Sequence, residues 1–287
     1  MLIANPIYDT AFKRMMENEK VAKFFISTLL GETIESVEVR PQEFTHNIEL
    51  LGVGIFRLDF IATIKTSEGE YKKVLIEVQK ARNLIDVMRF RNYLAEQYKK
   101  KDTINNQEMV LPITTIYVLA FKLPGIEAAC IKVERKYKDL VDNTYIEQKS
   151  AFVEQLTHDS FVVQAERITG RYQTRLDKLL AVFEQANFVT DTHTTKDFNH
   201  TPDEEEIKLI TDILHHAGTD PVERKKIENE QEAYRTLDAM FEKERRSLEE
   251  KLYEKIKEID EKDKALQEMA AELEALKRRL GGQQQQI

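Results

Sequence analysis

Two carboxylates and an amide stand in strand-like stretches of residues 57–80, where most of the neighbouring side chains are apolar. The segment reads RLDFIATIKTSEGEYKKVLIEVQK, and a turn that contains glycine joins its two extended halves. Asp59 lies in the first half. Glu77 and Gln79 share one face of the second half, because side chains alternate along a strand. We expect an interior hairpin that is covered on both faces.

These side chains suit a divalent cation. Mg²⁺ prefers oxygen ligands and takes only one or two carboxylates from a protein. On adjacent antiparallel strands Asp59 and Glu77 can converge on such an ion, with Gln79 beside Glu77. The bound ion would polarise a phosphate or lower the pKa of a water molecule. The alternative is that both acids are ordinary surface residues of the hairpin, with Arg57 and Lys73 as their partners.

The segments around the hairpin indicate a mixed α/β domain. A helix is expected to begin at Asn5 and Pro6, to be interrupted at the MENE stretch, and to end at Gly31. The remaining elements follow from their apolar spacing: an extended segment from residue 34, a helix at 84–100, strands at 111–121, 130–137 and 160–164, and a helix at 174–187. The apolar stripe of the helix at 84–100 is expected to contain Leu84, Val87, Met88, Arg91, Leu94, Ala95 and Tyr98.

Charge and cysteine content narrow the class of protein. The net charge of −8 belongs almost entirely to residues 201–287, because residues 1–190 balance to zero, so an anionic ligand for the first part is not excluded. A single cysteine excludes a disulfide framework and a zinc site built on cysteines. The longest apolar run, at 111–121, is shorter than the roughly 20 residues that a membrane helix needs. We expect a cytoplasmic protein with no membrane partner.

Four short motifs carry a resemblance to a known family: NPIYDTAFK, RLDF, IEVQK and RFRNYLAEQY. In this order they resemble the bacterial PD-(D/E)XK nucleases of the transposase type, relatives of the recombination-promoting nucleases. The resemblance covers about residues 1–190. It implies a restriction-endonuclease-like core, in which helices flank a central mixed sheet, and a DNA endonuclease that depends on Mg²⁺ or Mn²⁺.

The resemblance also implies roles for single residues. Asp59 and Glu77 match the metal-binding acids, and Gln79 matches the third position of the motif, where the wider superfamily has lysine. Asp9 and Lys13 match the family's DxxFK signature, and Lys13 is the expected source of positive charge in place of the missing lysine. A glutamine offers hydrogen bonds but no positive charge, so the alternative is a catalytically weak or inactive nuclease fold that serves as a DNA-binding or scaffold protein.

Basic residues gather after the hairpin, between residues 80 and 101. We assign Arg82, Arg89 and Arg91 to contacts with the phosphates of DNA. Arg91 can also be a side chain that lies along apolar surface with its charged end in water, and the lysines at 99–101 can belong to a solvated helix face.

The C-terminal third is expected to be separate from the domain at 1–190. It consists of a polar linker at 191–202, a short helix at 203–218, a long helix at 220–280 and a disordered tail at 281–287. Apolar residues of the long helix recur at an average spacing of 3.5 residues, with the best repeats after residue 264. This pattern favours a homo-oligomer through a coiled coil. The alternative is a single solvated helix held by charge pairs four residues apart.

Overall fold

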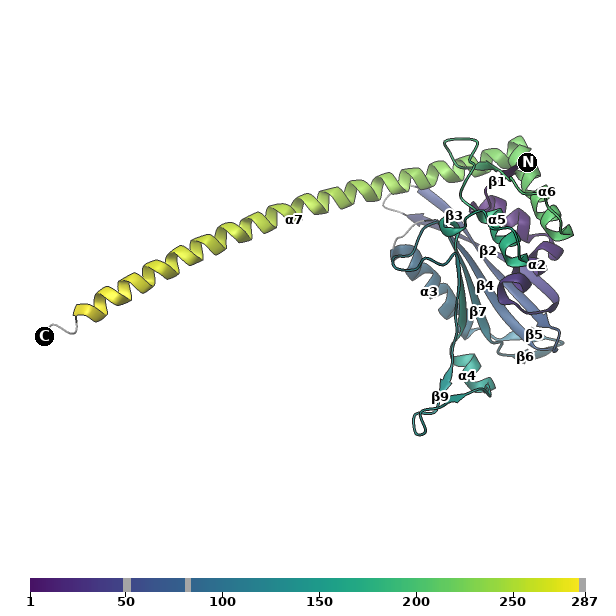
Figure 1. Ribbon diagram of the computed structural model, residues 1–287, viewed down its shortest axis with the longest axis horizontal. Helices are drawn as coiled ribbons and strands as arrows, with labels where there is room; N and C mark the ends of the chain where they lie inside the picture. Colours follow the sequence, from purple (N-terminus) through teal and green to yellow (C-terminus); the bar gives the residue numbers. More distant parts are fainter. Residues whose placement is uncertain (49–52, 81–83, 284–287) are drawn as a thin grey trace. The chain divides into compact units, whose positions relative to one another are not determined.

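The computed structural model describes residues 1–48, 53–80 and 84–283 (Figure 1). The chain divides into two compact units, Met1–Glu232 and Ala233–Ile287. The first unit contains a six-stranded mixed sheet flanked by helices, as the sequence predicts. The second unit belongs to the long helix α7 (Pro221–Gln283), which starts in the first unit.

The sheet has the strand order β2-β3-β4-β7-β11-β8. Strands β2, β3 and β4 are antiparallel neighbours, β4, β7 and β11 run parallel, and β8 closes the sheet in the antiparallel direction. The parallel pairing of β4 with β7 needs a crossover, which α3 provides. The bounds are Ile34–Ile48 for β2, Val53–Thr66 for β3, Tyr71–Gln79 for β4, Leu84–Lys99 for α3, Ile113–Leu119 for β7, Cys130–Val133 for β8 and Asp159–Gln164 for β11.

Four helices cover one face of the sheet and bury the main core against it (Figure 1). They are α1 (Asp9–Met16), α2 (Glu19–Leu30), α5 (Arg175–Phe183) and α6 (Glu205–Thr219). Phe12 of α1 lies at the centre of this core, with its ring centroid 5.2 Å from that of Phe60 on β3 and 5.6 Å from that of Phe25 on α2. We call this side of the sheet the α1 face.

Helix α3 covers the opposite face, which we call the α3 face. A smaller cluster of Leu75, Phe90, Tyr93 and Ile113 joins α3 to β4 and β7. The predicted stripe of α3 is partly wrong, because Met88, Arg91 and Ala95 are exposed. The pattern admits two neighbouring stripes, and the helix buries the one that carries two aromatic rings. The larger apolar area of these rings outweighs that of methionine and alanine.

The start of the first helix also differs from the prediction. Asn5 does not cap it: its side chain accepts a hydrogen bond from the backbone of Ile7 and donates to Gln185 and to the carbonyl of His193. Helix α1 begins only at Asp9. The predicted interruption and stop are confirmed, because Asn18 caps α2 and Gly31 ends it with a φ of 69°.

The predicted linker at 191–202 and the domain end near residue 190 are wrong. The linker contains β12 (Thr195–Asp197), which pairs with β1 (Leu2–Ala4) in an antiparallel ribbon. Helix α6 packs against β1 so closely that a Cβ atom on Gly218 would lie 2.9 Å from the backbone nitrogen of Ala4. The first unit therefore incorporates α6 and continues to Glu232. The short polar segment gave no signal of this, because its partner strand is almost 200 residues away.

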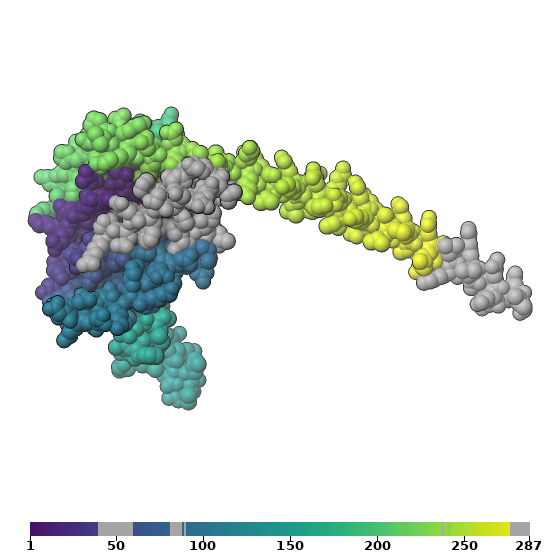
Figure 2. Space-filling view, turned by 180° about the vertical axis from the view of Figure 1, so that it is seen from behind, coloured from purple at the N-terminus to yellow at the C-terminus, as the bar shows by residue number. Residues whose placement is uncertain are grey.

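Short elements complete the first unit. Strands β9 (Tyr137–Lys138) and β10 (Tyr145–Ile146) form a hairpin that is followed by α4 (Ala151–Leu156), and Figure 2 shows this segment in teal, standing out from the surface. The others are β5 (Asp102–Ile104), β6 (Gln107–Met109) and a 3₁₀ turn, η1, at Ala165–Arg167.

Helix α7 extends three residues into the predicted tail, and residues 284–287 lie outside the described part of the chain. Among the helices that the structure describes, none is long and apolar enough to cross a membrane.

Candidate active site

The hairpin of β3 and β4 places the two candidate metal ligands side by side along the backbone. In the antiparallel register Asp59 lies directly opposite Glu77, and directly opposed residues lie on the same face of a sheet. Gln79 follows two residues later on β4 and therefore shares this face. The side chain of Asp59 is outside the described set, so only its place in the register is known.

Glu77 and Gln79 lie on the α3 face and are buried. Both side chains lie on the same face of β4 as Leu75, which packs under α3. Val74, Ile76 and Val78 lie on the opposite face and belong to the core on the α1 face. Glu77 is 0% exposed and Gln79 is 6% exposed. A carboxylate buried to this degree is costly unless it is paired, hydrogen-bonded or coordinated to a metal. The reading of Glu77 as a surface acid is therefore excluded.

The proposed surface partner of Glu77 has another role. Lys73 is also buried, and its ammonium group lies 2.8 Å from a carboxylate oxygen of Asp102 on β5. This ion pair attaches the β5–β6 hairpin to the start of β4. Lys73 therefore belongs to the opposite end of the strand from Gln79.

Tyr117 joins the candidate site, although no sequence motif contains it. The parallel register places Tyr117 of β7 beside Glu77, and its ring contacts Phe90 of α3 at 4.7 Å between centroids. Burial, with the nearby charge of Glu77, raises the pKa of Tyr117 to about 12. The phenol therefore keeps its proton at neutral pH, near enough to Glu77 for the charge of that carboxylate to act on it. In the sequence, Tyr117 was marked only by being a tyrosine within a predicted buried strand.

The two residues of the DxxFK signature start from the other side of the sheet. Asp9 is buried at the first position of α1 and Lys13 is half-buried one turn later, and α1 packs on the α1 face. Glu77 and Gln79 lie on the α3 face. The structure therefore does not gather all five predicted catalytic residues on one face.

Lys80 lies immediately after Gln79 and turns to the α1 face, as the pleat predicts. Its ammonium group lies 4.1 Å from the ring centroid of Tyr8 and pairs with the carboxylate of Glu230. The same carboxylate accepts hydrogen bonds from the backbone N–H groups of Asp9 and Thr10, at 2.8 and 3.2 Å. Glu230 of α7 thus caps α1 in place of a residue next to the helix in sequence.

The predicted phosphate-binding residues are placed unevenly. Arg82 lies outside the described residues, and so does the side chain of Arg89. Arg91 is exposed on α3, so it is not enclosed between the helix and the sheet. Lys80, which contributed to the basic segment, has a side chain only 7% exposed and is neutralised by Glu230.

The candidate residues fit a metal ion by their chemistry. Two acids opposite each other and a neighbouring amide provide oxygen donors, as a hard divalent cation requires. Among the side chains that the structure describes, no three His, Cys, Asp or Glu residues converge on one point. The side chain of Asp59 is not among those described. The donor set therefore rests on Glu77, Gln79 and the register position of Asp59.

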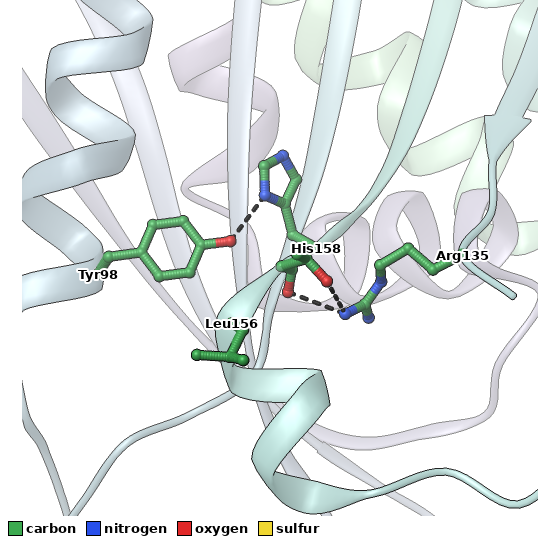
Figure 3. A pocket seen from close by; sticks show the side chains of 5 residues that line it. Tyr98, Arg135, Leu156 and His158 are labelled. Carbon is green, nitrogen blue, oxygen red and sulfur yellow. Dashed lines mark hydrogen bonds between the residues drawn. The ribbon is translucent and has the colours of Figure 1, made fainter. Parts of the chain in front are cut away.

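A hollow of about 410 Å³, lined in part by Tyr98, Arg135 and His158, lies at the opposite end of the parallel strands from Gln79 (Figure 3). The Tyr98 hydroxyl and Nδ1 of His158 share a hydrogen bond of 2.8 Å across it, while Arg135 is bound to Thr157, Glu154 and Asp159. Burial and the charge of Arg135 hold the pKa of His158 below its usual value. His158 immediately precedes β11, whereas Gln79 ends β4, so this hollow is separate from the candidate site.

Comparison with known proteins does not identify a relative. No family model, no curated protein and no solved structure matches this chain.

Proposed function

We propose that this protein is a metal-dependent DNA endonuclease with its active centre on the α3 face of β3 and β4. The observation that carries the proposal is the register position of Asp59 directly opposite the fully buried Glu77, with Gln79 next on the same face. The resemblance of the surrounding motifs to PD-(D/E)XK nucleases supports the same assignment.

Each residue would have a distinct role. Asp59 and Glu77 would hold Mg²⁺ or Mn²⁺, which when bound supplies a water of lowered pKa and polarises the phosphodiester. The Gln79 amide would donate a hydrogen bond to the attacking water or to a phosphate oxygen. The Tyr117 hydroxyl, which stays protonated, would orient Glu77. The exposed Arg91 would contact the DNA backbone.

The neutral residue at position 79 limits the expected rate. A lysine there would place a positive charge beside the reacting phosphate, whereas Gln79 and Tyr117 offer only neutral donors. Loss of one preorganised stabilising group typically costs about 10²–10³ in rate. We therefore expect slow cleavage.

The second candidate function is a scaffold or DNA-binding protein that keeps the nuclease fold without strong activity. One observation favours it: the second unit carries a long row of exposed apolar side chains on α7. In this case α7 would be the part that makes the functional contact.

A plasmid-cleavage assay with matched variants separates the two. The full chain is incubated with supercoiled plasmid and Mg²⁺, and Glu77→Gln is compared with Glu68→Gln, which changes an exposed acid in the turn of the same hairpin. An endonuclease should lose at least about 100-fold in nicking rate in Glu77→Gln and nothing in Glu68→Gln. Equal activity in the two variants would refute the site.

Metal binding provides an independent measurement. Mg²⁺ should raise the melting temperature of the wild-type protein and of Glu68→Gln, and this shift should be lost in Asp59→Asn. A scaffold would show no metal-dependent shift in any of the three proteins. Circular dichroism of each variant shows whether it is folded.

A further inference from the structure

One side of α7 carries an exposed row of large apolar residues. Between residues 248 and 273 they are 53–61% exposed, and no two neighbours in the row are more than seven residues apart. The row consists of Leu248, Leu252, Ile259, Leu266, Met269 and Leu273. Such a row of exposed apolar residues on a long, charged helix marks an interaction surface, and its spacing is that of a coiled-coil seam.

Lysine residues in the seam determine how a partner helix can lie. Lys255 and Lys262 occupy core positions of the repeat that begins with Leu248 and resumes at Met269. In a parallel, in-register pair each of them would face its own copy and repel it. In an antiparallel pair centred between Asp260 and Glu261, each lysine faces an apolar side chain. Its aliphatic stem can then pack in the seam while the ammonium group reaches water.

The flanking charges support the antiparallel arrangement with the same centre. In a parallel pair, Glu244 would lie beside the partner's Glu249, and Glu258 would lie beside the partner's Asp263. Both contacts are repulsive. In the antiparallel pair Lys251 lies beside the partner's Glu272, and this attraction occurs twice by symmetry.

The register is equally specific. Moving the antiparallel pair by one heptad in one direction brings Glu258 beside the partner's Glu258, and moving it in the other direction brings Glu258 beside the partner's Glu272. In the centred arrangement Glu258 lies beside the partner's Ala265, so no like charges meet. Charge complementarity therefore points to a second copy of this chain in one orientation and one register.

We propose that two copies of this protein associate through an antiparallel coiled coil of α7, centred between residues 260 and 261. The seam consists of eight layers, four of them unique: Leu248 with the partner's Leu273, Leu252 with the partner's Met269, Lys255 with the partner's Leu266, and Ile259 with the partner's Lys262. This assembly does not depend on nuclease activity.

Cysteine cross-linking of the full chain tests the orientation. In a Cys130→Ser background the only native cysteine is removed, and Leu252→Cys and Met269→Cys are made as two separate variants. After subunit exchange, the mixture should form a disulfide-linked dimer under mild oxidation, whereas each variant alone should not. Cross-linking of Leu252→Cys alone would establish a parallel pair and overturn the proposal. So would a monomer or a trimer in light scattering.

A charge swap tests the register. Lys251→Glu should weaken the dimer about tenfold, because two attractions become two repulsions, and adding Glu272→Lys should restore it. Lys257→Glu is the matched control, because residue 257 lies on the outer side of the repeat and should leave the dimer unchanged. In a parallel pair Lys251 would lie beside the partner's Ile256, so the second substitution would not restore binding. Failure of the restoration overturns the register.

Discussion

The carboxylate of Glu230 holds three parts of the first unit together, and its removal should be costly. It accepts hydrogen bonds from the first two N–H groups of α1 and neutralises Lys80 at the end of β4. The Lys80 side chain is 7% exposed and that of Glu230 is 13% exposed, so water cannot readily replace either contact. Glu230→Ala leaves both a helix N-terminus and a buried ammonium group without this partner.

The magnitude follows from these contacts. Loss of a helix cap costs about 1 kcal/mol. Removal of one member of a buried ion pair costs about 3–5 kcal/mol, and here the lower end applies because Lys80 retains the ring of Tyr8. The two losses share one side chain and are not strictly additive. We expect Glu230→Ala to lower the free energy of unfolding by about 3 kcal/mol.

Urea unfolding followed by tyrosine fluorescence measures this loss, since the chain has ten tyrosines and no tryptophan. Glu228→Ala is the control on the same helix: Glu228 pairs with Arg224 at the surface, and its removal should cost less than about 0.5 kcal/mol. In a Lys80→Met background, Glu230→Ala should cost only about 1 kcal/mol, which is the contribution of the cap. If Glu230→Ala and Glu228→Ala are equally stable, the bridging role of Glu230 is refuted.

Two further predictions concern the part of the chain that had been expected to be a linker and a separate helix. Gly218→Ala should destabilise the protein by about 1–3 kcal/mol, because the new Cβ atom meets the backbone of Ala4. In an open helix the same substitution would stabilise the protein. Thermal unfolding therefore distinguishes the two cases by the direction in which the melting temperature changes. Burial lowers the pKa of Lys196 to about 7, and its ammonium group donates to the carbonyl of Glu184. Between pH 7 and the ordinary lysine pKa, the unfolded chain therefore binds more protons than the folded chain, so the free energy of unfolding should rise with pH. Urea unfolding should show a gain of about 1.5 kcal/mol from about pH 7 to 8.5. The Lys196→Met variant should not show this gain.

Local sequence patterns predicted the hairpin that carries the candidate site well. The alternation of side chains along β3 and β4 and the glycine turn between the strands predicted an antiparallel hairpin. The register that places Asp59 opposite Glu77 agrees with this prediction. These features depend on interactions between residues close in sequence, and strand alternation leaves few choices once one face is apolar. The helix end at Gly31 was predictable for the same reason.

The surroundings of the site were not predictable in the same way. The sequence could not place Tyr117 beside Glu77, because parallel pairing between β4 and β7 depends on the crossover through α3. The family resemblance also grouped Lys13 with Glu77, whereas α1 packs on the other face of the sheet. The choice of face for a helix depends on which apolar surfaces fit together, and periodicity alone contains no information on that.

By itself the sequence determined the mixed α/β class, the hairpin with its two acids and an amide, and the heptad repeat of the long helix, because each follows from a short-range periodicity. Only the tertiary structure decided that the presumed linker pairs with β1, that α6 closes on Ala4, and that Glu230 reaches Lys80 and the start of α1. These contacts join residues about 150 to 220 positions apart. They form where packed surfaces and buried charges find complementary partners, and that complementarity exists only in the folded chain.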